Sequence, residues 1–207
     1  MAGLEGYSGS SGKVDISAVE CRSNDDTTDI SISALSDLDI TANASWASGT
    51  APSLTSTTIY VWADNNSGTQ RFILDDVTGS NLTDADKARR VGTFITDSSD
   101  SIIPFSKLGT GDEVITYYNG SVQDFSAVTT SYVDYDVSVP SDIEVEPIIK
   151  IIGDANTISS SYDGATDIIQ GIYNIDLKLT TSTASVKLKT SSGTVGVGHI
   201  LGYKEKR

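Results

Sequence analysis

The amino-acid sequence predicts an all-β protein, a jelly-roll-like β-sandwich of about a dozen short antiparallel strands. Apolar and polar residues alternate with a period of two along much of the chain, which is typical of strands with one buried face. Turns rich in Gly, Asn, Asp and Ser separate these segments, and helical periodicity is nearly absent. Since no helices alternate with the strands, a sandwich is favoured over a parallel sheet.

In the first half of the chain, several segments show this strand pattern. Ile30 and Ile32 share one face of residues 29–33, and residues 58–63 are rich in β-branched and aromatic side chains. The polar runs DNNSGT (64–69) and DSSD (97–100) predict turns between neighbouring strands. The expected strands are DISIS (29–33), LDIT (38–41), TIYVWA (58–63), QRFIL (70–74), VGTFIT (91–96) and SIIPF (101–105).

The second half continues the alternation. Asn119 and Gly120 supply the positive φ of a tight turn, so a hairpin is expected between EVITYY (113–118) and SVQDFSAV (121–128). In YVDYDVSV (132–139), Asp134 and Asp136 are expected to face outward, opposite Val133, Tyr135, Val137 and Val139. The remaining strands are expected in VEPIIKII (145–152), within residues 168–181, in ASVKLKT (184–190) and in GTVGVGHILGY (193–203).

Two local patterns interrupt the strands. Thr83, with Asp86 three residues later, resembles a capping box and predicts one or two helical turns in TDADKARR (83–90). Pro104 and Pro147 lie inside apolar runs, and proline cannot donate a ladder hydrogen bond. Those runs are therefore expected at sheet edges or at bulges.

The expected domain organisation is a flexible N-terminal arm, residues 1–13, followed by a single β-sandwich domain, residues 14–207. The arm, MAGLEGYSGSSGK, is rich in small residues and has neither the basic region nor the apolar region of a secretory signal. The remainder shows no fixed-period repeat and no long linker.

The chain is strongly acidic, with a formal net charge of −14. A phosphate backbone would be repelled, so nucleic acid is not an expected partner. Residues 108–149 hold eight acids and no Lys or Arg, whereas residues 177–207 hold six basic residues and one acid. This asymmetry indicates either solvated strand faces or an acidic face and a basic end that suit packing between copies.

The chain has one cysteine, Cys21, and one histidine, His199. An intrachain disulfide and a structural zinc site with four N or S ligands are therefore excluded. Nothing near either residue indicates a Cys–His nucleophile. No stretch of about 20 apolar residues is present, so no membrane insertion by a helix is expected.

Two oxygen-rich loops, Ser23–Asp29 and Asp64–Thr69, have the side chains that Ca²⁺ prefers. The second loop departs from a calcium loop, because its glycine is Gly68 and because Asp75, rather than Glu, stands at the twelfth place. Plain β-turns are the alternative interpretation for both. No cofactor and no metal ligand is assigned.

No catalytic residue is assigned, and the protein is expected not to be an enzyme. The acids are too numerous to single out a carboxylate pair, and Ser8 lies in a glycine-rich segment that lacks the nucleophile-elbow spacing. Aromatic residues on strands favour a core or subunit interface, with a sugar-stacking platform as the alternative. These residues are Trp46, Trp62, Tyr117, Tyr118, Tyr132 and Tyr135.

Arg89 and Arg90 open a strand–turn–strand pattern that runs from residue 88 to residue 105. Successive strand residues point to opposite faces, so one arginine is expected outward and one inward. An inward arginine would need a carboxylate partner, since an unpaired buried charge is costly. Gly92 indicates a bulge or a close backbone approach. The pattern indicates architecture rather than catalysis.

Five segments, taken in order, resemble a β-rich domain common in tailed-bacteriophage virion proteins, often at tail-fibre tips or in small appendage proteins. The most distinctive is ARRVGTFITDSSDSIIPF (88–105), and the last, HILGYKEKR (199–207), matches a Gly-aromatic-x-x-x-Arg ending. The other three are CRSNDDTTDISIS (21–33), TTIYVWADNNSGT (57–69) and DVSVPSDIEVEPIIKI (136–151).

The resemblance implies a jelly-roll-like sandwich in a homotrimer, located in the virion, with a structural or host-attachment role. Its implied partners are other virion proteins and a host surface receptor or glycan, and it transfers no binding residues. The chain departs from the family in the polar loop GSNLTDADKA (79–88), and a compact appendage is expected rather than a long fibre. Two alternatives stay open: a capsid or capsid-decoration jelly roll, and a carbohydrate-binding or carbohydrate-active sandwich.

Overall fold

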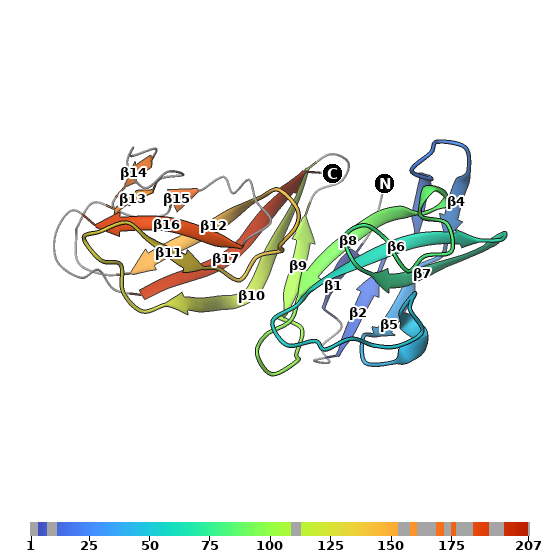
Figure 1. Ribbon diagram of the computed structural model, residues 1–207, viewed down its shortest axis with the longest axis horizontal. Helices are drawn as coiled ribbons and strands as arrows, with labels where there is room; N and C mark the ends of the chain where they lie inside the picture. The colour runs from blue at the N-terminus through green and yellow to red at the C-terminus, as the bar shows by residue number, and fades with distance from the viewer. Residues whose placement is uncertain are drawn as a thin grey trace. The chain divides into compact units, whose positions relative to one another are not determined.

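The computed structural model describes residues 4–7, 12–108, 113–152, 158–160, 169–171, 175–176, 184–190 and 197–206. The fold is all-β, with several antiparallel sheets, as predicted (Figure 1). The chain divides into two compact units, Met1–Gly111 and Asp112–Arg207, where a single domain was expected. Each unit has its own apolar interior, and Leu4–Tyr7 of the expected arm forms a strand.

The first unit contains two larger sheets and a hairpin. One sheet has the strand order β9-β1-β2-β5, the other has the order β7-β6-β8, and β3 pairs with β4. The strands are β1 (Leu4–Tyr7), β2 (Lys13–Ile16), β3 (Val19–Arg22), β4 (Asp29–Ile32), β5 (Leu35–Asp39), β6 (Thr58–Asn66), β7 (Thr69–Asp75), β8 (Arg89–Ile95) and β9 (Phe105–Leu108). Two short 3₁₀ helices, η1 (Asn43–Ser45) and η2 (Ala85–Lys87), lie in its loops.

Aromatic side chains join the two larger sheets of the first unit. Phe94 of β8 stacks on Phe105 of β9 with ring centroids 6.0 Å apart, and both rings are buried. Trp46 and Trp62 are also buried, and their indole N–H groups donate to the carbonyl oxygens of Ile40 (2.7 Å) and Asp76 (3.0 Å). Both tryptophans therefore belong to the core and are not surface platforms for sugars.

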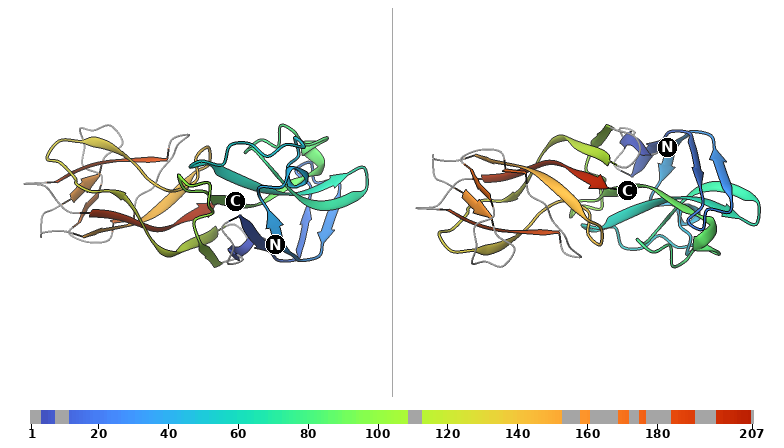
Figure 2. Two further views of the ribbon diagram at one scale, coloured as in Figure 1. Left: turned by 90° about the horizontal axis from the view of Figure 1, so that it is seen from below. Right: turned by 90° about the horizontal axis from the view of Figure 1, so that it is seen from above.

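The strands of the second unit form two sets of paired strands, which Figure 2 shows in yellow-green to red. Their orders are β15-β12-β17-β10 and β11-β16-β13-β14. Phe125 of β10 and Tyr135 of β11 join them, with ring centroids 4.8 Å apart. The strands are β10 (Glu113–Phe125), β11 (Val133–Asp136), β12 (Val145–Ile152), β13 (Ile158–Ser160), β14 (Ile169–Gly171), β15 (Ile175–Asp176), β16 (Ser185–Thr190) and β17 (Val197–Lys206).

Turn chemistry decides where β6 and β7 meet. Ser67 and Gly68 both have positive φ (53° and 88°), which gives a two-residue hairpin turn that pairs Asn66 with Thr69. The turn predicted in DNNSGT is confirmed.

The hairpin predicted at Asn119-Gly120 is wrong. Neither residue has positive φ, and β10 continues through both as one strand. The two halves of β10 pair with the same strand, β17, and the register shifts between Tyr117 and Val122. The dipeptide therefore lies in a bulge rather than a turn, because pairing with β17 on both sides keeps the backbone extended.

The stretch from Ala88 to Phe105 forms one strand and a turn, but not the second predicted strand. β8 carries a bulge at Val91, since Val61 pairs with Gly92 while Trp62 pairs with Arg90; the bulge expected near Gly92 is confirmed. Asp97 closes the turn, and Ile102 makes only an isolated bridge to Thr96. The next strand, β9, begins directly after Pro104.

The other local predictions are partly confirmed. Pro147 of β12 lies next to a register shift between Ile148 and Ile149, as expected for a proline at a bulge. Residues 38–41 were predicted as a strand, but β5 covers Leu35–Asp39 instead. Val137 and Val139 are buried as predicted, whereas Val133 is exposed.

A side-chain amide joins the hairpin β3–β4 to β7. The Gln70 Oε1 atom accepts a hydrogen bond from the Ser31 N–H (2.8 Å), and its Nε2 atom donates to the Asp29 carbonyl oxygen (3.0 Å). Gln70 thus makes to β4 the two hydrogen bonds that a neighbouring strand would make. This contact fixes the loop at the end of the hairpin, which carries the most concentrated polar network of the first unit.

Candidate functional site

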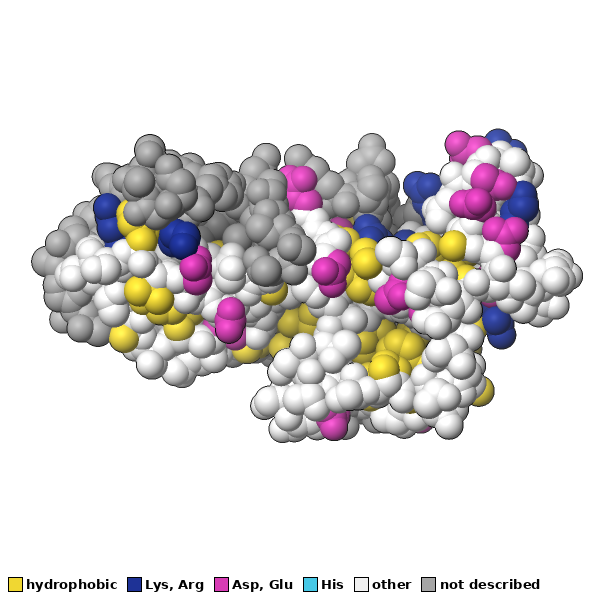
Figure 3. Space-filling model, in the orientation of Figure 1, with side chains coloured by type: hydrophobic (Ala, Val, Ile, Leu, Met, Phe, Trp, Pro, Cys, Tyr) yellow, Lys and Arg dark blue, Asp and Glu magenta, His cyan; other side chains and the backbone are white. Residues whose placement is uncertain are grey.

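The loop Ser23–Asp29 and the segment Thr83–Arg90, two regions that the sequence singles out separately, lie side by side. Backbone hydrogen bonds join them: Asn24 N–H donates to the Ala88 carbonyl (2.9 Å) and Asp25 N–H to the Asp86 carbonyl (3.1 Å). The Asn24 side chain also donates to the Ala85 carbonyl (3.0 Å). Figure 3 shows acidic and basic side chains gathered over this end of the first unit.

The helical turn in this segment is only η2. Its N-cap is Asp84, whose side chain accepts a hydrogen bond from the Asp86 N–H at 3.1 Å. Thr83, the predicted N-cap, lies one residue before the observed one. Asp84 takes this position because an Asp side chain accepts hydrogen bonds well at an N-cap. The short turn brings Lys87 over the neighbouring loop.

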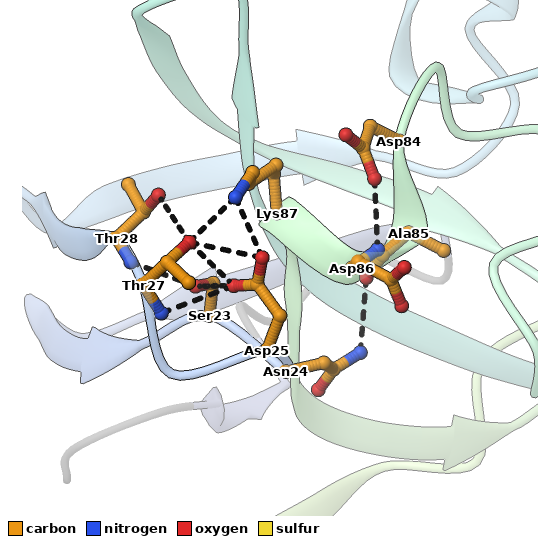
Figure 4. A network of polar contacts seen from close by, with 9 residues as sticks. All are labelled: Ser23, Asn24, Asp25, Thr27, Thr28, Asp84, Ala85, Asp86 and Lys87. Carbon is orange, nitrogen blue, oxygen red and sulfur yellow. Dashed lines mark hydrogen bonds and ion pairs between the residues drawn. The ribbon is translucent and has the colours of Figure 1, made fainter.

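Lys87 and Asp25 form the centre of what we call the Asp25 cluster, made of Ser23, Asp25, Thr27 and Lys87 (Figure 4). Lys87 Nζ lies 2.6 Å from Asp25 Oδ2 and 2.5 Å from Thr27 Oγ1. Asp25 Oδ1 accepts hydrogen bonds from Ser23 Oγ (2.6 Å) and from the Thr27 N–H (3.1 Å). Each carboxylate oxygen therefore has a donor within the cluster.

The cluster holds both charged groups in their ionised forms. Hydrogen bonds from Lys87, Ser23 and Thr27 bring the pKa of Asp25 far below its ordinary value. The hydrogen bond to Asp25 raises the pKa of Lys87. An ammonium group thus occupies the position where a divalent cation would have to bind, so this geometry favours a braced loop over a calcium site.

We expect Lys87→Met to move the pKa of Asp25 upward, toward its ordinary value. A carboxyl group whose pKa is lowered by folding stabilises the folded state at pH values above its ordinary pKa. This contribution is lost as the pH falls through the lower pKa of the folded state. The variant should therefore lose it at a higher pH than the parent. A titration of the Asp25 carboxyl carbon by NMR measures this shift. Lys150→Met, an exposed lysine on β12, is the matched control and should leave the titration of Asp25 unchanged.

The second calcium candidate, Asp64–Thr69, is a hairpin end. Asp64 is buried and pairs with Arg71 across β6 and β7, with Arg71 Nε 3.2 Å from Asp64 Oδ2. Asp75 is buried as well and accepts hydrogen bonds from the N–H (2.9 Å) and Nδ2 (2.7 Å) of Asn81. Among the residues that the structure describes, no three His, Cys, Asp or Glu side chains are grouped so that they could hold a metal ion.

A recurring Asp-x-Ser/Thr pattern explains the many loop acids of the first unit. In each case the carboxylate accepts a hydrogen bond from the backbone N–H two residues later, which closes an Asx turn. The pairs are Asp25 with Thr27, Asp39 with Thr41, Asp76 with Thr78 and Asp97 with Ser99, with distances of 2.8–3.1 Å. These acids fix loop conformations, and the spacing of two residues that marks them is visible in the sequence.

Asp76 accepts four hydrogen bonds from its own loop. It accepts from the N–H groups of Thr78 (2.8 Å) and Ser80 (3.2 Å) and from both hydroxyls. Partial burial alone would raise the pKa of Asp76, but the hydrogen bonds from Ser80 and Thr78 outweigh it and lower the pKa to about 2.

We expect the stability that Asp76 confers to be present above about pH 4 and to be lost as the pH falls toward 2. Because the side chain is exposed, solvent screening limits this contribution to about 1 kcal/mol. Urea unfolding at several pH values should show a shallower loss below pH 4 for Asp76→Asn than for the parent. Asp26→Asn, an exposed loop residue, is the control and should keep the parent's slope.

In the second unit, Asp124, Ser138 and Tyr118 form a smaller polar group. Asp124 accepts hydrogen bonds from the N–H and Oγ of Ser138 (both 2.6 Å), and Tyr118 Oη donates to the Ser138 carbonyl (2.5 Å). Burial raises the pKa of Asp124 although the hydrogen bonds from Ser138 oppose it. The hydroxyl of Ser138 bonds the carboxylate directly, without the intervening imidazole of a nucleophilic serine. This group anchors the segment after β11.

The paired arginines have architectural contacts. The Arg90 guanidinium lies over the ring of Tyr60, 5.6 Å from its centroid, which is a cation–π geometry. Tyr60 lies on the adjacent strand β6, so this contact joins two neighbouring strands of one sheet. Cys21 lies in β3 of the first unit, where burial raises the pKa of its thiol, and His199 lies in β17 of the second.

No protein-family model, curated protein or solved structure matches this chain. Within the described residues, no helix is long and apolar enough to span a membrane.

Proposed function

We propose that this protein is a non-enzymatic structural component of a bacteriophage virion, of the tail-fibre or appendage type, that contributes to host attachment. The observation that carries the proposal is the use of the loop carboxylates. Asp25, Asp39, Asp76 and Asp97 each accept hydrogen bonds from their own loop. Such loops keep one shape, which suits a building block of a particle.

The stretch Ala88–Phe105, the most distinctive part of the resemblance to phage virion proteins, also supports an architectural role. Arg90 contacts Tyr60 within one sheet, and the turn after β8 is closed by Asp97, which accepts from the N–H groups of Ser99 (2.8 Å) and Ser101 (3.0 Å). Every contact named here holds strands or turns together.

The proposal includes location in the virion, a homotrimer, contact with other virion proteins, and a host surface receptor or glycan as the target. The net charge of −14 disfavours nucleic acid as a partner. Fold alone assigns no function, so the proposal depends on the bonded loops and the resemblance together.

Mass spectrometry of purified particles, with immunogold labelling, tests the proposal. We expect the chain in the particles at low copy number, located on the tail or another appendage. A copy number in the hundreds, spread over the head, would instead identify a capsid or decoration protein. Absence from particles whose other structural proteins are detected would contradict both assignments.

A further inference from the structure

The second unit has a sheet face that carries a mixed group of aromatic, aliphatic and polar side chains. In the sheet β15-β12-β17-β10, Thr116, Pro147 and Tyr203 occupy one row and are buried. The next row, on the opposite face, is formed by Tyr117 of β10, Gly202 of β17 and Ile148 of β12. The central position of this row has no side chain.

Tyr117 is the most exposed of the described aromatic side chains, at 40%. Its neighbour Tyr118 points to the other face, where its ring packs edge-on against that of Tyr203 and its hydroxyl bonds Ser138. The alternation of strand residues thus assigns one tyrosine to the interior and leaves the other on the surface. An exposed aromatic ring beside a glycine offers a flat apolar surface to a ligand.

Hydrogen-bonding side chains lie on both sides of this row. On one side Lys204 stands between Ile115 and Glu146, and on the other His199 stands between Gln123 and Lys150. Along β12, Glu146, Ile148 and Lys150 are spaced by about 7 Å, the repeat of one strand face. A small hollow adjoins the side on which Lys204 and Glu146 lie. It is lined by Glu113, Glu144, Val145, Glu146 and Lys204.

The charged side chains at the hollow are mostly acidic, with three glutamates and one lysine. Lys204 Nζ lies 3.9 Å from Glu146 Oε2, and Glu113 and Glu144 line the same hollow. The whole chain carries a net charge of −14, so an anionic ligand would be repelled. The carboxylates can accept hydrogen bonds from hydroxyl groups, so the face suits a ligand that combines hydroxyl groups with an apolar ring face and carries no negative charge.

We propose that this face, centred on Tyr117, binds a neutral pyranose of a surface polysaccharide. The sugar ring stacks on Tyr117, and its hydroxyls bond Glu146 and Lys204 on one side and Gln123 on the other. This inference rests on the proposed attachment function and names its ligand class. It places the site on a sheet face rather than on the loops at the ends of the strands.

Affinity electrophoresis of the purified full-length chain tests the site, with gels containing dextran, laminarin or galactomannan. We expect at least one of these neutral polysaccharides to slow the protein, and we expect Tyr117→Ala to weaken binding about tenfold or more. Tyr117→Phe, which keeps the ring, should bind as the parent does. Tyr132→Ala, a partly exposed tyrosine near β11, is the matched control and should also retain binding.

Three results would overturn the inference. They are no retardation in any neutral gel, binding by Tyr117→Ala equal to that of the parent, or stronger retardation by the anionic polymer polygalacturonate. Sedimentation of Tyr117→Ala adds a fourth: loss of self-association without a change in sugar binding would mean that a second copy covers this face. None of these results changes whether the chain is found in particles, so the proposed function is tested separately.

Discussion

Gly202→Ala is expected to destabilise the second unit strongly. The φ of Gly202 is +150°, a backbone conformation that side-chain-bearing residues rarely adopt, and an added Cβ would lie 1.9 Å from the backbone oxygen of Thr116. That oxygen belongs to the paired strand β10 and cannot move without breaking the ladder. We expect a loss of about 3 kcal/mol or more in the free energy of unfolding.

The two tryptophans, Trp46 and Trp62, both lie in the first unit, so their fluorescence reports on that unit alone. For Gly202→Ala we expect the circular-dichroism transition of the strands to move to lower urea while the tryptophan transition stays in place. Gly120→Ala is the control, because an added Cβ there has no atom within 4 Å, and it should leave both transitions unchanged. Equal shifts for the two glycines would contradict the proposed strain at Gly202.

Phe94→Ala is expected to destabilise the first unit by about 3–5 kcal/mol. The ring is 1% exposed and stacks on Phe105 across the two sheets, so its removal leaves a cavity at their junction. Tryptophan fluorescence during urea unfolding measures the loss directly, because both indoles lie in the same core.

Leu108→Ala is the matched control for Phe94→Ala, because Leu108 lies in β9 near Phe105 but is 60% exposed. We expect its effect to stay within about 0.5 kcal/mol, as for most surface changes. A double-mutant cycle of Phe94 and Phe105 should show coupling, since the two rings are in contact. Additive effects would mean that the two sheets do not pack through this pair.

Local sequence patterns predicted the strands well where the turn chemistry and the pairing agree. Ser67 and Gly68 form the expected hairpin because nothing else competes for β6 and β7 at that point. Asn119 and Gly120 have an equally strong turn signal, but both halves of β10 pair with β17. The sequence of β17 lies about 80 residues away, so a pattern read within one short window misses this competition.

The Asp25 cluster shows the same limit for a polar site. The sequence indicated an oxygen-rich loop at Ser23–Asp29 and a helical turn near Lys87, but the contact between them joins positions 62 residues apart. Only the packed structure shows that the loop oxygens are bonded by a lysine. Tyr117 is a contrasting case, because strand alternation alone separates it from Tyr118 once the position of β10 is known.

The amide of Gln70 has a consequence for the protein at high local concentration. An uncovered strand edge attracts strands from other molecules and promotes uncontrolled aggregation. Here two backbone groups of β4 are already engaged by a side chain of the same molecule, at Asp29 and Ser31. At high concentration, molecules of this protein can therefore stay separate along this edge, because the edge offers fewer unpaired backbone groups to a second copy.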